Sequence, residues 1–166
     1  MKLRLFIAIA GWLMISNAAA KPNDSYIGGG LYSADTIDEF IVTASVTLTD
    51  RIVVHGFYTQ LFDSLVRVQG DYYLTENWFF GAGAVSYSWT GGSETGSLFS
   101  AGWRHYFSEQ LSLSVEIGHY DVFNGSDFFR GRLFYDITER WRLGFEYQSN
   151  SSGLMNDQAI TINYRF

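Results

Sequence analysis

The residues best suited to acid–base chemistry are three histidines, His55, His105 and His119. His119 is followed by Asp121 and, in the next segment, by Ser126. A hydroxyl beside a histidine that is oriented by an acid is the arrangement used by acyl hydrolases and acyltransferases. His119, Asp121 and Ser126 are therefore catalytic candidates. Their spacing forms no recognisable motif, so no catalytic residue is assigned.

A larger group of charged residues recurs in the polar phase of alternating segments. In these segments apolar and polar residues alternate one by one, which is typical of β-strands with one apolar and one polar face. We expect nine of these residues to form a charge network: Arg67, Asp71, Arg104, Glu116, Arg130, Arg132, Asp136, Arg142 and Glu146.

Metal and cofactor chemistry find little support in the sequence. The acidic stretch at residues 35–39 and the other loops rich in Asn and Asp lack the spacing of an EF-hand or a zinc site. Cysteine is absent, so no disulfide holds the chain together. No cofactor and no metal are predicted.

The first 20 residues have the layout of a cleaved secretory signal peptide. Lys2 and Arg4 precede an apolar run from Leu5 to Ile15, and small residues end at Ala20. The remaining residues, 21–166, form one domain by length. They carry nine basic and 17 acidic residues, which makes nucleic acid an improbable partner.

Four similar stretches, at residues 48–52, 74–78, 107–111 and 137–141, indicate tight turns. Each has Thr or Ser followed by Asp or Glu between apolar residues, and the hydroxyls fall at Thr49, Thr75, Ser108 and Thr138. Each interval between them fits two strands and a loop. The sequence therefore predicts about ten strands in an up-and-down antiparallel transmembrane β-barrel, with eight strands as the alternative.

The loops at the opposite end are predicted from their composition at residues 33–38, 60–64, 90–96, 123–127 and 149–157. The faces of most strands are clear from alternation. Residues 78–89, "WFFGAGAVSYSW", are mixed and allow no assignment of faces.

The composition of the polar face indicates that this face lines a confined interior and that the apolar face meets lipid. After the signal peptide the chain has a single lysine, Lys21, whereas a solvated exterior is usually rich in Lys and Glu. Aromatic residues are expected in two bands at the membrane interfaces. The turn-end band comprises Trp78, Phe107, Trp141, Tyr164 and Phe166, and the loop-end band comprises Tyr58, Tyr87, Trp89, Phe99, Tyr120, Phe123, Phe128 and Tyr147.

The signal peptide, the alternating strands and the aromatic C-terminus resemble the small outer-membrane β-barrels of Gram-negative bacteria, similar to the OmpX-like and OmpA-transmembrane group. The resemblance covers residues 23–166. It implies an outer-membrane location with periplasmic termini and tight turns, and contact with outer-membrane lipid and lipopolysaccharide. It also implies that Tyr164 and Phe166 form the signal read by the barrel-assembly machinery. A monomer is expected.

Three classes of function stay open. The favoured one is an integral barrel with a polar, salt-bridged lumen, acting in the envelope or as a narrow pore for small solutes. The second is an enzyme that modifies lipid A or phospholipid, and the chain lacks the His-x-Ser pattern of the lipid A deacylases. The third is a surface binding protein, for which the short loops offer little area.

Overall fold

The computed structural model describes residues 25–34, 37–60, 64–151 and 156–166. The expected signal peptide, residues 1–20, lies outside them. Ten strands follow one another along the described chain: β1 (Tyr26–Ala34), β2 (Ile37–Thr49), β3 (Ile52–Thr59), β4 (Ser64–Tyr73), β5 (Trp78–Trp89), β6 (Gly92–Tyr106), β7 (Leu111–Tyr120), β8 (Ser126–Asp136), β9 (Trp141–Asn150) and β10 (Asp157–Arg165).

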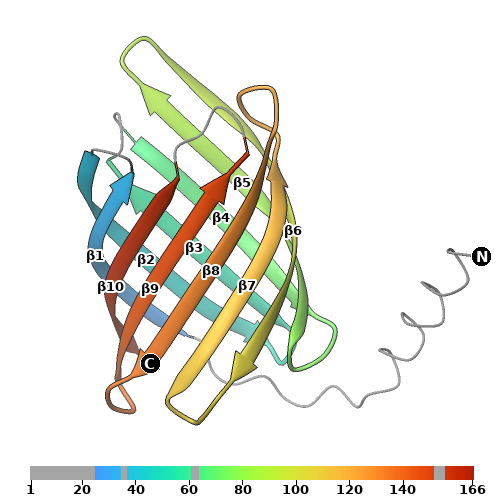
Figure 1. The fold of residues 1–166 in the computed structure, drawn as a ribbon, viewed down its shortest axis with the longest axis vertical. Helices are drawn as coiled ribbons and strands as arrows, with labels where there is room; N and C mark the ends of the chain where they lie inside the picture. Colours follow the sequence, from blue (N-terminus) through green and yellow to red (C-terminus); the bar gives the residue numbers. More distant parts are fainter. Residues whose placement is uncertain (1–24, 35–36, 61–63, 152–155) are drawn as a thin grey trace, which may run out of the picture.

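The strands form a closed antiparallel barrel in which each strand pairs with its neighbours in sequence, and β10 pairs with β1 (Figure 1). The seam runs from Tyr26 opposite Arg165 to Ala34 opposite Asp157. Closure leaves no unpaired sheet edge at this seam, because the backbone of β10 pairs with β9 on one side and with β1 on the other. The predicted fold class is confirmed with ten strands, and the eight-strand alternative is wrong.

The four turn hydroxyls act as the sequence repeat indicates. Thr49, Thr75, Ser108 and Thr138 each accept hydrogen bonds from the backbone N–H groups two and three residues further on, at distances of 3.0 to 3.3 Å. One short side chain therefore satisfies two backbone donors that the strand ladder does not pair. The repeated Thr or Ser is a structural requirement of the turn.

The opposite end of the barrel differs from the prediction at residues 90–96. Strand β5 continues to Trp89 and β6 begins at Gly92, so most of this stretch is strand. Gly91 has a φ of 106°, a left-handed conformation that glycine adopts without steric cost. The Gly and Ser content suggested a loop, yet the resulting β5–β6 hairpin extends beyond the β7–β8 loop at the upper end of Figure 1.

Apolar side chains cover the outer wall, as the alternation predicts, and the lumen holds both polar side chains and two apolar clusters. The alternation of inward and outward residues also holds in β5, where Phe79 and Val85 are buried inside and Trp78 and Phe80 are exposed. Its inward glycines had hidden the period. A side chain at Gly102 on β6 would collide with the ring of Phe79, so a glycine there makes room for the phenylalanine.

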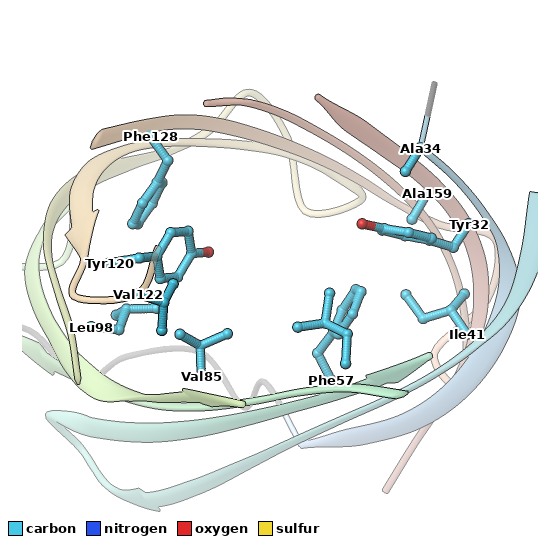
Figure 2. Close-up of a cluster of buried hydrophobic side chains, with 11 residues drawn as sticks. Tyr32, Ala34, Ile41, Phe57, Val85, Leu98, Tyr120, Val122, Phe128 and Ala159 are labelled. Carbon is cyan, nitrogen blue, oxygen red and sulfur yellow. The ribbon is translucent and has the colours of Figure 1, made fainter. Parts of the chain in front are cut away.

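Two apolar clusters lie inside the barrel, one toward each end. Near the loop end, Tyr32, Phe57, Tyr120 and Phe128 are among the side chains that project inward from a ring of strands (Figure 2). Near the turn end, Val53, Tyr73 and Phe79 form a smaller cluster. The charged residues lie between these clusters and beside the lower one.

The expected loop-end aromatic band is wrong for part of its members. Tyr120 and Phe128 are 1% and 4% exposed inside the lumen, and Tyr87 and Phe123 pack against the same inner cluster. Tyr58, Trp89, Phe99 and Tyr147 are exposed. The sequence misled because an aromatic residue near a strand end fits either a membrane interface or the mouth of a barrel. All five expected turn-end aromatics are exposed.

None of the described residues belongs to a helix long and apolar enough to cross a membrane.

Candidate functional site

The candidate site is the charged middle of the lumen, which we call the mid-lumen network. Its members project inward from β4, β7, β8 and β9: Arg67, Gln69, Glu116, Tyr120, Arg130, Arg132, Glu146 and Gln148. Alternation sets their inward direction, and the tilt and stagger of the strands bring them to a common height.

One ion pair crosses the lumen. The guanidinium Nη2 of Arg67 on β4 lies 2.8 Å from Oε1 of Glu146 on β9, and these strands stand five apart in either direction around the ten-strand ring. Arg67 Nη1 also donates to Gln148 Oε1 at 3.2 Å. The pair therefore joins opposite walls and narrows the lumen at mid-height.

Glu116 is the most heavily bonded acid of the network. Its carboxylate accepts from Arg130 at 3.0 Å, from Arg132 at 2.8 Å and from Gln69 at 2.7 Å, and Glu116 is 1% exposed. Arg130 also donates to the hydroxyl of Tyr120 and, at 3.2 Å, to Gln69. Because a buried charge is costly without a partner, each of these contacts helps to retain the charges inside.

Arginine side chains also stack on aromatic rings. The guanidinium carbon of Arg67 lies 4.6 Å from the ring centre of Phe57, and that of Arg130 lies 4.7 Å from the ring centre of Phe128. Planar guanidinium permits this stacking while its edge keeps donating hydrogen bonds. The charged middle is thereby joined to the apolar cluster at the loop end.

A second group, the turn-end cluster, comprises Asp136, Arg142 and Arg165. Asp136 accepts from Nε of Arg142 at 2.6 Å and from Nη1 of Arg165 at 2.8 Å. These residues come from β8, β9 and β10, which are neighbours in the ring. The cluster therefore links adjacent strands along one wall and does not cross the lumen.

The nine charged residues expected in the lumen all project inward, and several of them also bond to residues outside that set. Asp71 contacts His55 at 3.1 Å and accepts from Gln69 at 2.7 Å. Arg104 donates to Tyr106 at 3.4 Å. The sequence analysis named His55 only as an acid–base candidate, assigned Tyr120 to the outward aromatic band and omitted Arg165, although the inward phase of each could have indicated a place in the lumen.

Two cavities of about 30 Å³ adjoin the mid-lumen network. They share Tyr26, Thr43, Arg132 and Glu146 in their linings. Each volume matches about one water molecule's share of the liquid, and the linings supply polar partners. The described lumen thus holds spaces of water size beside the ion pairs.

The catalytic candidates are not brought together. His119 projects from the outer wall, where its Nδ1 lies 2.8 Å from Oδ1 of Asp127, whereas Ser126 is buried on the lumen side. Asp121 is exposed at the end of β7 and is not the acid that His119 contacts. The sequence placed the three residues near one another in the chain, but the alternation of faces separates the base from the hydroxyl.

No group of three or more His, Cys, Asp or Glu that could hold a metal ion occurs within the described part of the chain.

The fold is that of a porin-like barrel. The KdgM porin has 10% sequence identity, a TM-score of 0.53, and a match over 85% of this chain and 99% of that chain. A structure described as the KdgM porin in complex with disordered oligogalacturonate gives a TM-score of 0.56 at the same identity and coverage. At this identity the likeness defines the fold alone.

The NanC porin is also similar, at 11% identity over 86% of this chain and 98% of that chain, with a TM-score of 0.48. The sequence matches no protein-family model and no curated protein. The structural neighbours are porins, and membership of the narrower OmpX-like group receives no support from them.

Proposed function

We propose that the protein is an outer-membrane barrel whose lumen forms a narrow pore for water and small solutes. The observation that carries this proposal is the Arg67–Glu146 pair, which joins opposite walls at mid-height. A polar, charged lumen favours hydrophilic solutes, and an ion pair across the lumen limits the size of the solutes that can pass.

The outer wall supports the membrane location. Large apolar side chains such as Leu31, Phe40 and Ile117 are 60% or more exposed, which is costly in water and favourable in lipid. With the expected signal peptide at residues 1–20 and the assembly signal at Tyr164 and Phe166, we place the protein in the outer membrane as a monomer. It then contacts outer-membrane lipid and lipopolysaccharide, with its tight turns in the periplasm.

The size limit comes from the packing of the lumen. The largest fully buried side chains in the lumen include Arg104, Arg130, Tyr73 and Phe79. The cavities beside the network hold about 30 Å³ each. A KdgM porin structure is described with oligogalacturonate, whereas the cross-lumen pair here favours much smaller solutes.

A pore is favoured over the lipid-modifying enzyme because His119 and Ser126 face opposite sides of the wall. Acyl transfer requires the base to reach the hydroxyl that it activates.

Liposome swelling tests the proposal with solutes of graded size. Vesicles that contain the refolded barrel should admit glycine faster than protein-free vesicles, and should exclude the trisaccharide raffinose. Folding is checked first by heat-modifiable migration on a gel. Background rates for glycine would mean a closed structural barrel and would overturn the proposal, as would equal rates for glycine and raffinose.

A further inference from the structure

One of the two small cavities in the lumen, which we call the His55–Arg132 cavity, lies between polar side chains from opposite walls. Its volume is about 30 Å³, and its lining includes His55 of β3 and Arg132 of β8. These strands stand five apart in either direction around the ring of ten strands. Arg67 and Glu146, whose ion pair crosses the lumen, line the same cavity. The cavity therefore lies at the constriction that a solute must pass.

His55 presents a hydrogen-bond acceptor that has no donor. Its Nε2 lies 3.1 Å from Oδ2 of Asp71, whose side chain is fully buried. A carboxylate only accepts hydrogen bonds, so Nε2 carries the proton of the neutral imidazole and Nδ1 keeps a free lone pair. The neutral form satisfies Asp71 without adding a positive charge beside Arg132. Nδ1 is buried and finds no hydrogen-bond partner in the part of the chain that the structure describes.

Arg132 presents a hydrogen-bond donor that has no acceptor. Its Nη2 donates to Glu116 at 2.8 Å, and its side chain is only 7% exposed. Its Nε is buried and has no hydrogen-bond partner among the described residues. A guanidinium stays charged and its N–H groups only donate. The residues around the cavity thus contribute one acceptor and one donor that the protein leaves unsatisfied.

The charges around the cavity are already paired with one another. Arg67 bonds to Glu146 at 2.8 Å, and Arg130 and Arg132 share Glu116 at 3.0 and 2.8 Å. A charged solute would have to replace one of these partners, and the replacement would leave a buried charge unpaired. An uncharged polar solute leaves the pairs intact.

A single hydroxyl group complements both unsatisfied atoms. Its O–H donates to Nδ1 of His55, while its oxygen accepts from Nε of Arg132. An ammonium cannot accept from arginine, and a carboxylate cannot donate to the imidazole. A cavity of about 30 Å³ has room for one hydroxyl group.

We propose that the His55–Arg132 cavity binds one hydroxyl group at a time and makes the pore selective for small uncharged polyols. This inference rests on the proposed pore and names its class of solute. A polyol exchanges its hydrogen bonds with water for similar bonds in the cavity, whereas a solute without a hydroxyl leaves Nδ1 and Nε unsatisfied. Two hydrogen bonds hold a hydroxyl weakly enough for the solute to leave.

Liposome swelling with erythritol and glycine tests the selectivity. Erythritol carries a hydroxyl group on every carbon and is larger than glycine, which is a zwitterion without a hydroxyl. A pore that sorts by size alone therefore admits glycine faster. After subtraction of the rates in protein-free vesicles, we expect erythritol to enter about fivefold faster than glycine, the factor that one hydrogen bond of ordinary strength provides.

Three single variants locate the selectivity. His55→Phe keeps a ring but removes the acceptor, and should lower the erythritol rate about fivefold, to that of glycine. His55→Gln can donate to Asp71 through its amide nitrogen and accept through its oxygen, so it should retain the preference. His105→Phe makes the same change on the outer wall, where His105 stacks on Trp103 at 5.2 Å, and should have no effect.

Equal entry of the two solutes through the wild-type barrel, or faster entry of glycine, would overturn the site and leave the pore standing. Background rates for both solutes would overturn the pore and the site together, so the two failures are distinct. A preference that persists in His55→Phe, or that is lost equally in His105→Phe, would also overturn the site. Heat-modifiable migration confirms the folding of each variant first. Arg132→Lys, which keeps the charge but removes Nε, replaces His55→Phe if that variant does not fold.

Discussion

The mid-lumen network and the turn-end cluster use the same chemistry in different geometries. Both pair arginine with a carboxylate at 2.6 to 3.0 Å. The Arg67–Glu146 pair joins β4 to β9 across the barrel, whereas Asp136 joins β8 to β9 and β10 along one wall. An ion pair therefore constricts a barrel only when its strands are far apart in the ring.

Burial separates Glu116 and Arg130 from the turn-end cluster, whereas Arg67 and Glu146, with side-chain exposures of 12% and 16%, are no more buried than Asp136 and Arg142. Glu116 and Arg130 of the network are each 1% exposed, while Arg165 of the turn-end cluster keeps 22% of its side chain exposed. Water can screen and replace the bonds of the turn-end cluster more readily. Equal substitutions should therefore cost more at Glu116 than in the turn-end cluster.

The largest effect on stability is expected for Glu116→Ala. The change leaves Arg130 and Arg132 buried without their shared carboxylate, so the free energy of unfolding should fall by about 3–5 kcal/mol. Urea unfolding of the barrel in lipid vesicles measures it. Glu139→Ala, at an exposed turn, is the control and should stay within about 0.5 kcal/mol of wild type. A loss no larger than that of the control would remove the energetic basis of the comparison.

A smaller loss is expected for Asp136→Ala in the turn-end cluster. Asp136 accepts from Arg142 and Arg165 near the end of the barrel. The same unfolding measurement should show a loss of about 1.5–3 kcal/mol, the range for hydrogen bonds to charged groups. A loss equal to or larger than that of Glu116→Ala would contradict the expectation that the more deeply buried carboxylate contributes more to stability.

A smaller effect again is expected for Thr138→Ala in the turn between β8 and β9. The hydroxyl accepts from Arg140 N–H at 3.2 Å and from Trp141 N–H at 3.1 Å, and water can replace it in an exposed turn. We expect a loss of about 1 kcal/mol in the unfolding experiment. Thr138→Ser keeps the acceptor and should retain most of the stability. Equal losses in the two variants would contradict the role of the hydroxyl.

The smallest effect is expected for Asp127→Asn on the outer wall. Its pair with His119 is exposed, and such pairs contribute about 0.2–1 kcal/mol. Unfolding in lipid vesicles should therefore differ little from wild type. A loss as large as that of Asp136→Ala would show that exposure does not set the scale.

The fold was largely predictable because the turns and the strands each have a local sequence pattern that indicates their place in the barrel. The turn hydroxyls at Thr49, Thr75, Ser108 and Thr138 mark the strand pairs, and period-two alternation assigns the faces. Strand β5 resisted assignment because Gly81 and Gly83 stand at inward positions, where a glycine gives no sign of its face. The hairpin at Gly91 was misread because strand residues beyond the barrel rim have the composition of a loop.

The pairing within the lumen could not be predicted in the same way. Alternation shows that Arg67 and Glu146 project inward, but their contact depends on the relative heights of β4 and β9, which follow from strand tilt and stagger around the closed ring. For the same reason Asp71 pairs with His55 and not with an arginine of the expected network. The pairing of His119 with Asp127 on the outer wall required the observed register of β7 and β8.

The central claim is that the Arg67–Glu146 ion pair across the lumen sets the width of the pore. Conductance in planar bilayers tests it by comparing wild type with two charge-balanced double variants. Arg67→Ala with Glu146→Ala removes the cross-lumen pair, and Asp136→Ala with Arg142→Ala removes a pair of equal chemistry along one wall.

The account predicts larger single-channel conductance for the variant that lacks the cross-lumen pair, and wild-type conductance for the variant that lacks the turn-end pair. Heat-modifiable migration confirms that each variant is folded before it is measured. Unchanged conductance on loss of Arg67 and Glu146, or an equal increase in both variants, would contradict the claim.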